Sequence, residues 1–192
     1  MRLHLSFAAL MLAACASAPD AVAQNNGSGA QTGTKTAAPA QKPPCSDPEF
    51  DDFDFWVGEW DVYGPKGKLA GTNSIRKEEY GCLLVERWTN AGGITGQSYN
   101  FVDLATGKWR QVWVSAGMTI DYSGGLNDKG AMVLEGTIGY GAGQSGNGAK
   151  FRGTWTPNAD GTVTQHFEQY DGAKGEWTDW FVGTYKRRAA SD

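Results

Sequence analysis

Ten short stretches of alternating apolar and polar residues constrain the fold of this chain more than any other feature. The turns between them carry hairpin residues, such as Asn-Asp-Lys-Gly at 127–130 and Pro-Asn-Ala-Asp-Gly at 157–161. No stretch after residue 45 shows a long helical period. The sequence therefore predicts an all-β domain, an antiparallel up-and-down barrel that is closed because closure removes exposed strand edges. The predicted strands cover approximately residues 55–63, 69–79, 82–89, 95–103, 108–115, 118–125, 131–138, 150–156, 162–170 and 177–187.

The most aromatic stretch, residues 53–63, reads Phe-Asp-Phe-Trp-Val-Gly-Glu-Trp-Asp-Val-Tyr. With a period of two, Trp56, Gly58 and Trp60 fall on one face, which is expected to face the core. Upstream, Phe50 and its neighbours follow an Asp-Pro pair, a pattern typical of a short helical turn. Such a turn would close one end of the barrel.

The first residues predict export. Residues 1–23 have the features of a secretory signal peptide, because one cationic residue precedes an apolar run too short to span a bilayer. Residues 12–15 (Leu-Ala-Ala-Cys) resemble a bacterial lipobox, and we favour cleavage before Cys15 with lipidation of that cysteine. Alanine rather than aspartate follows Cys15, which by resemblance to known lipoproteins indicates the outer membrane facing the periplasm. The alternative is cleavage after residues 21–23 (Ala-Val-Ala), which would leave a soluble periplasmic or secreted protein.

Residues 16–44 are rich in Gly, Ser, Thr, Ala, Gln and Pro and contain no aromatic residue, so we expect a disordered linker. The barrel domain is expected over 45–188. Cys45 and Cys82 remain after processing, and a disulfide between them is predicted, because an oxidising compartment favours pairing of an even number of cysteines. Two lone cysteines without a nearby histidine do not favour a metal site.

The charge of the chain excludes some partners. The net charge is −4, which does not favour nucleic acid as a partner. Lys108 and Arg110 alternate with aromatic residues, and so do Lys150 and Arg152, which places these charges on the face opposite the core. A membrane-spanning barrel would carry an apolar band there, so we expect contact with the membrane only through a lipid anchor.

Several motifs resemble a known superfamily. The Gly-x-Trp pattern of residues 58–60, followed by meandering strands and a final basic segment (Tyr-Lys-Arg-Arg, 185–188), resembles the lipocalin and fatty-acid-binding (calycin) superfamily. The resemblance implies that an arginine of the last strand, here Arg187, packs on Trp60. Together with the segments at 81–88 and 107–114, the first-strand motif Phe-Trp-x-Gly-x-Trp is similar to an uncharacterised bacterial family with a lipocalin-like barrel. That family implies the fold and no activity.

The candidate ligand-binding residues come from the alternation of aromatic residues and amides. A barrel of this strand count commonly encloses a cavity, which would be lined from these faces. The alternative is a filled core in which the amides bond one another. The predicted ligand-binding residues are Trp60, Trp88, Trp109, Gln111, Trp113, Gln165, Phe167 and Arg187.

Two residues suggest further chemistry. Glu86 alternates with Leu84 and Trp88, and an inward carboxylate could act as a general acid or base. An outward orientation, or a salt bridge with Arg110 or Arg152, is the alternative that we favour. No cofactor is predicted; His166 is expected to point outward, with axial ligation of haem as an alternative.

We therefore expect an exported lipocalin-like protein that binds a small hydrophobic or amphipathic molecule. One alternative is an enzyme of the isomerase or cyclase type that uses Glu86 on the same barrel. Another is a structural or envelope-maintenance lipoprotein without a ligand. The chain lacks a nucleophile elbow, a phosphate loop and a paired His/Ser/Asp pattern, which favours a binding protein over an enzyme.

Overall fold

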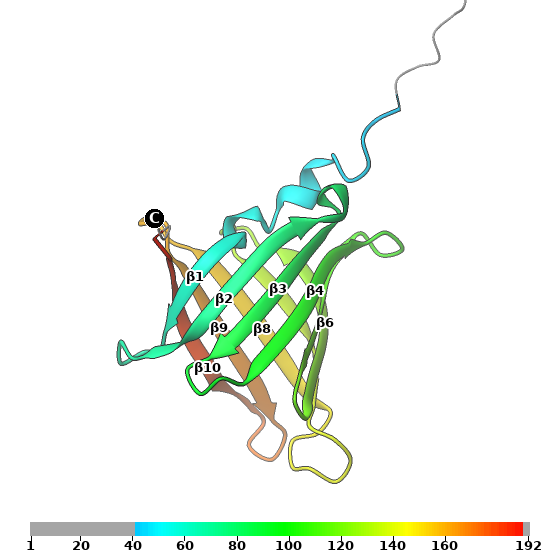
Figure 1. The fold of residues 1–192 in the computed structure, drawn as a ribbon. Coiled ribbons are helices and arrows are strands. Elements are labelled where there is room, and N and C mark those ends of the chain that lie inside the picture. Colours follow the sequence, from blue (N-terminus) through cyan, green and yellow to red (C-terminus); the bar gives the residue numbers. More distant parts are fainter. Residues whose placement is uncertain (1–40, 190–192) are drawn as a thin grey trace, which may run out of the picture. The chain divides into compact units, whose positions relative to one another are not determined.

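The computed structural model describes residues 41–189, which contain a closed antiparallel barrel of ten strands (Figure 1). Each strand pairs with its neighbours in the sequence, and β1 pairs with β10 to close the barrel. The predicted all-β, up-and-down architecture is confirmed. The strands are β1 (Gly58–Tyr63), β2 (Leu69–Glu78), β3 (Leu83–Asn90), β4 (Thr95–Asp103), β5 (Lys108–Ser115), β6 (Met118–Leu126), β7 (Met132–Gly139), β8 (Ala149–Pro157), β9 (Val163–Asp171) and β10 (Glu176–Arg187).

Short 3-10 helices close one end of the barrel. They are η1 (Pro48–Asp51) and η2 (Asp54–Trp56), and a third, η3 (Glu79–Gly81), links β2 to β3 at the same end. Phe53 and Trp56 are fully buried, with ring centroids 4.9 Å apart. Trp155 packs against Phe53 in an edge-to-face arrangement, with ring centroids 5.2 Å apart. The first strand therefore begins at Gly58 rather than at residue 55 as predicted, because residues 54–56 turn inward to fill this end.

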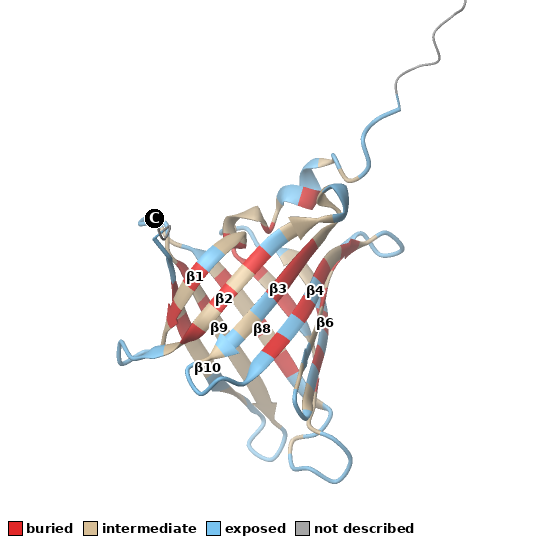
Figure 2. Cartoon of the chain, in the orientation of Figure 1, coloured by how far each residue is buried: buried red, intermediate tan, exposed pale blue. Residues whose placement is uncertain are grey.

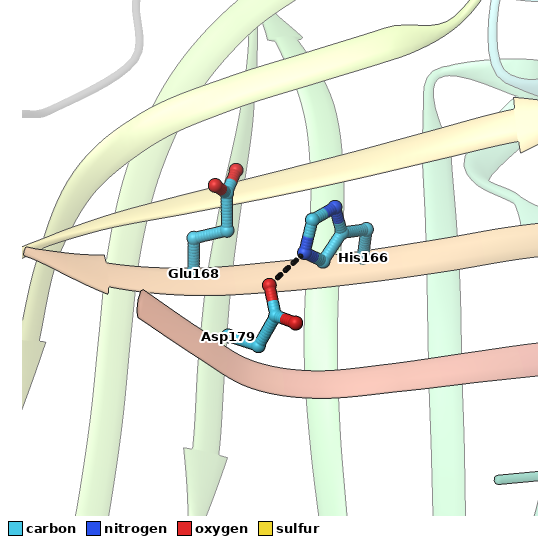
Figure 3. A group of neighbouring side chains, drawn as sticks. All are labelled: His166, Glu168 and Asp179. Atoms are coloured by element: carbon cyan, nitrogen blue, oxygen red, sulfur yellow. Dashed lines mark hydrogen bonds and ion pairs between the residues drawn. The ribbon is translucent and has the colours of Figure 1, made fainter. Parts of the chain in front are cut away.

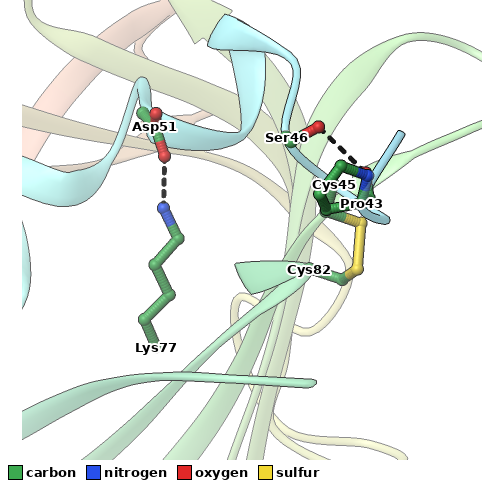
Figure 4. Close-up of a disulfide and its surroundings, with 6 residues drawn as sticks. All are labelled: Pro43, Cys45, Ser46, Asp51, Lys77 and Cys82. Atoms are coloured by element: carbon green, nitrogen blue, oxygen red, sulfur yellow. Dashed lines mark hydrogen bonds and ion pairs between the residues drawn. A yellow bond between two sulfur atoms is a disulfide. The ribbon is translucent and has the colours of Figure 1, made fainter. Parts of the chain in front are cut away.

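A disulfide and an ion pair fix these helices to the barrel (Figure 4). Cys45, which precedes η1, is bonded to Cys82, which precedes β3, as predicted. Lys77 of β2 pairs with Asp51 of η1 at 2.5 Å, as drawn in Figure 4, and also with Asp54 of η2 at 2.8 Å. Because disulfides persist in oxidising environments, this bond indicates a non-cytoplasmic environment.

Burial alternates along the strands and marks the inward faces (Figure 2). In β4, for example, the buried residues are every second one from Gly96 to Val102. The inward positions are apolar toward the closed end. Halfway along the barrel several are polar and still buried, namely Asn73, Glu86, Ser98, Asn100, Gln111 and Gln165. Burying a polar side chain without a hydrogen-bond partner is energetically costly, so each of these residues is expected to have partners in the interior.

Several predictions concern residues outside the described part of the chain. The signal peptide at 1–23, the lipidation of Cys15 and most of the linker at 16–44 are not described by the structure. Within residues 41–189, no helix has the length and apolar character needed to cross a membrane.

Candidate functional site

A cavity of about 510 Å³ occupies the end of the barrel opposite the 3-10 helices. Ile94, Ala116, Gly117 and Tyr140, from the connections that follow β3, β5 and β7, lie at its mouth, and its floor lies halfway along the strands. The residues around the mouth and upper wall are mostly apolar and aromatic: Trp88, Ile94, Trp113, Met118, Phe167, Trp180 and Phe181. The deeper residues are mostly polar: Glu86, Gln111, Tyr122, Gln165 and Tyr185. The cavity is therefore amphipathic, with its polar part at the bottom.

Glu86 is the only charged residue among those that line the cavity in the described chain. Its side chain is buried, and the residue is 4% exposed. Asn73 Nδ2 donates to Oε1 at 2.7 Å, and Ser98 Oγ donates to Oε2 at 2.6 Å. Burial disfavours the charged form more than these two hydrogen bonds favour it, and the pKa of Glu86 is raised to about 7.

The predicted outward orientation or salt bridge of Glu86 is wrong. Within residues 41–189, no lysine, arginine or histidine forms an ion pair with Glu86. Arg110 instead pairs with Asp121 at 2.7 Å, and Arg152 pairs with Glu168 at 2.8 Å. Both arginines lie on the outer face, because they are out of phase with the inward residues of their strands. Glu86 is thus a buried carboxylate that faces a cavity and has no cationic partner in the described part of the chain.

A chain of hydrogen bonds extends from Glu86 around one side of the barrel. Asn100 Nδ2 donates to Ser98 Oγ at 2.9 Å and to the carbonyl oxygen of Leu84 at 3.1 Å. Gln111 Nε2 donates to Asn100 Oδ1, and Tyr122 Oη donates to Gln111 Oε1. These residues occupy inward positions of β4, β5 and β6, and they fix the orientation of Ser98 toward Glu86.

A second branch extends in the other direction. Asn73 Nδ2 also donates to Tyr185 Oη at 3.1 Å, and Tyr185 Oη donates to Gln165 Oε1 at 3.0 Å. Burial, and then the nearby charge of Glu86, raise the pKa of Tyr122 and of Tyr185 well above the usual value. Both phenols therefore remain neutral donors over the physiological pH range. The two branches form a buried polar layer that orients the Glu86 carboxylate.

The structure brings together most of the predicted ligand-binding residues. Trp88, Gln111, Trp113, Gln165 and Phe167 line the cavity together with Glu86. Asn73 and Tyr122 were not among the predicted site residues, although both fall on inward positions of predicted strands. Their phase was visible in the sequence, but their place in the polar layer depends on neighbours from other strands.

Trp60, Trp109 and Arg187 do not line the cavity and instead belong to the closed end. Trp109 Nε1 donates to the carbonyl oxygen of Glu49 in η1 at 3.0 Å, and Trp60 Nε1 donates to that of Trp56 at 2.8 Å. Alternation predicted the correct face for both tryptophans. Alternation did not predict the position of these tryptophans along the barrel axis, because that position depends on how the strands are staggered around the barrel.

The contact expected between Arg187 and Trp60 is confirmed. The guanidinium lies 4.3 Å from the centroid of the Trp60 ring, and Nη1 donates to the carbonyl oxygen of Val57 at 2.9 Å. Gly58 has φ +143°, and a Cβ there would lie 2.3 Å from Arg187 Nη1. The positive φ favours glycine at this position, and a side chain there would also have to displace the Arg187 guanidinium, which makes the Gly-x-Trp motif a structural feature of the closed end.

His166 lies on the outer face, in a group with Glu168 and Asp179 (Figure 3). His166 Nε2 is 2.7 Å from Asp179 Oδ1, and Glu168 is paired with Arg152. Although three possible ligand atoms lie within 4.8 Å of one another, the arginine already neutralises one of the carboxylates. The group is accounted for as a cluster of paired polar side chains on the outer face, and haem ligation by His166 stays an alternative to the prediction of no cofactor.

Comparison with known proteins does not assign this chain to a family. No protein-family model matches the chain, and the search of curated proteins found no match. The fold and the site define a closed ten-stranded antiparallel barrel with an amphipathic cavity. The resemblance to a lipocalin-like bacterial family stays a prediction.

Proposed function

We propose that this protein binds a small amphipathic molecule in the barrel cavity. The observation that carries the proposal is the contrast between the aromatic mouth and the buried polar layer around Glu86. A cavity of about 510 Å³ lies within the size range of small-molecule sites, which combine apolar walls with a few placed polar groups. The apolar body of the ligand would contact Trp88, Trp113 and Phe167, and its polar end would reach the floor.

The proposed setting is the bacterial periplasm. The disulfide supports a compartment outside the cytoplasm, and the first 23 residues have the composition of a signal peptide. We propose that Cys15 carries a lipid anchor on the outer membrane and that residues 16–44 connect the anchor to the barrel. The role would then be to hold or carry the ligand within the cell envelope.

Binding is tested with a neutral fluorescent probe, N-phenyl-1-naphthylamine, and a pair of matched variants. Met118 lines the mouth, whereas Thr119 is exposed on the opposite face of the same strand. Met118→Trp is expected to fill part of the mouth and weaken probe binding at least tenfold, whereas Thr119→Trp leaves it unchanged. Equal effects of the two variants would contradict binding in the cavity. Absence of probe binding, together with native mass spectrometry showing no co-purified small molecule, would refute the proposed function.

A second candidate function is acid–base catalysis by Glu86. A buried carboxylate with a pKa of about 7, access to a cavity and no cationic partner among residues 41–189 has the properties of a general acid or base at neutral pH. Incubation of the co-purified ligand with the protein in D₂O separates the two functions. Recovery of the ligand unchanged supports a binding protein, whereas conversion or deuterium incorporation that is lost in Glu86→Gln supports an enzyme. The cavity supports ligand binding and acid–base catalysis over the third alternative, a structural barrel without a ligand.

A further inference from the structure

The Glu86 carboxylate at the floor of the cavity accepts fewer hydrogen bonds from the described residues than it has lone pairs. A carboxylate offers about four lone-pair sites, and within residues 41–189 only Asn73 and Ser98 donate to it. A ligand that ends in a group with several donors would match this arrangement.

The walls of the cavity favour a cation over a neutral donor. Aromatic rings line it at Trp88, Trp113 and Phe167, and the described lining contains no lysine, arginine or histidine. Aromatic faces attract cations, particularly where water is excluded. The protein's own side chains already bury the Glu86 carboxylate, so its desolvation is not an added cost when a cation binds.

We propose that the ligand is an organic amine: a small molecule with an aromatic or other apolar body whose protonated amino group binds the Glu86 carboxylate. This inference rests on the proposed function and specifies its ligand class. The ammonium group would donate to the free lone pairs of Glu86, and the apolar body would lie between the aromatic side chains nearer the mouth. The polar layer would position the carboxylate for this contact.

Amine binding would be linked to proton release. The adjacent strands present Asn73, Ser98 and Asn100 to Glu86, none of which titrates, and the titratable groups across the barrel are Tyr122 and Tyr185. Both tyrosines stay neutral because their pKa values are raised. An ammonium ion selects ionised Glu86, so binding below pH 7 releases the carboxyl proton and affinity falls as the pH is lowered.

The charged residues on the same strands do not disturb this linkage. Arg76 pairs with Glu59 at 3.1 Å, and Arg87 contacts Glu78 at 3.3 Å, all on the exposed side of the wall. Lys77 is held at the closed end by the carboxylates of η1 and η2. The proton released on amine binding is therefore assigned to Glu86.

The test compares three indole probes that share one body and differ in the terminal group: tryptamine, tryptophol and indole-3-acetate. Isothermal titration at pH 8 is expected to show tryptamine binding at least about tenfold more tightly than tryptophol, with indole-3-acetate the weakest. Glu86→Gln is expected to remove the preference for the amine, and Glu135→Gln, the same change at an exposed outer position, is expected to retain it. At pH 6, titration in buffers of different ionisation enthalpy should show release of nearly one proton in the wild type and none in Glu86→Gln.

The outcomes separate the two proposals. Equal binding of tryptamine and tryptophol, or a preference for tryptamine that survives Glu86→Gln, would overturn the amine inference while the cavity remains a binding site. If the indole probes and N-phenyl-1-naphthylamine all fail to bind, the amine inference and the proposed function both fail. Circular dichroism and thermal unfolding of Glu86→Gln verify that the variant is folded, and retained tryptophol binding verifies that its cavity is intact.

Discussion

Replacement of Glu86 by glutamine should make the protein more stable at neutral and alkaline pH. The substitution retains the size of the side chain and removes a charge that the interior disfavours. The pKa of Glu86 is about 7 in the folded protein, against an ordinary value of 4.5. Because one pKa unit corresponds to about 1.4 kcal/mol, the ionised carboxylate destabilises the fold by about 3 kcal/mol relative to its protonated form.

The direction of the pH dependence follows from the raised pKa. Between pH 4.5 and 7 the folded protein retains the Glu86 proton, whereas the unfolded chain has released it. Stability contributed by protonated Glu86 is therefore present at acid pH, is lost as the pH rises through this interval, and changes no further above it. In the difference between variant and wild type, the common titrations of the other groups cancel.

Urea denaturation at pH 5, 6, 7 and 8, with the disulfide intact, measures this difference directly. The free energy of unfolding of Glu86→Gln minus that of the wild type should increase by about 2 to 3 kcal/mol from pH 5 to pH 8. For the control Glu135→Gln, whose side chain is 59% exposed on the outer wall, the difference should stay constant. A constant difference for Glu86→Gln, or one that moves in favour of the wild type as the pH rises, would refute the assignment of a buried, unpaired carboxylate.

Three further predictions concern the closed end and the N-terminal segment. Replacing both Cys45 and Cys82 by serine should lower the free energy of unfolding by about 3 to 4 kcal/mol, because the bond closes a loop with a sequence separation of 37; an unchanged denaturation midpoint would contradict it. Arg187→Met should cost about 1 to 2 kcal/mol through loss of the contact with Trp60 and of one hydrogen bond, with little change in probe binding; a tenfold loss of binding would instead place the arginine in the site. Mass spectrometry of protein purified from its host should show a lipidated N-terminus at Cys15, whereas an unmodified N-terminus at residue 24 would refute the proposed anchor.

The sequence was sufficient to predict the barrel because side-chain alternation and turn residues are local signals. The strand predicted for residues 95–103 matches β4 in both bounds. The boundary of β1 was less accurate, since Phe55 and Trp56 continue the aromatic pattern while adopting a helical turn. Periodicity alone cannot separate a strand from a short turn when both bury aromatic residues.

The candidate site was only partly predictable, because its geometry depends on contacts between distant strands. Alternation placed Gln111 and Trp113 on the inward face, and they line the cavity. Trp109 is on the same face but lies at the closed end, where η1 accepts its hydrogen bond. The hydrogen-bond partners of Glu86 could not be predicted from the sequence of its own strand, because Asn73 and Ser98 donate to it from the two neighbouring strands.

The most direct test of the proposed binding site is a crystal structure of the protein with tryptamine at pH 8. We expect the indole between Trp88, Trp113 and Phe167, with the amine nitrogen about 3 Å from the Glu86 carboxylate. An indole bound outside the barrel, or a cavity filled by the protein's own side chains, would contradict the proposed binding site.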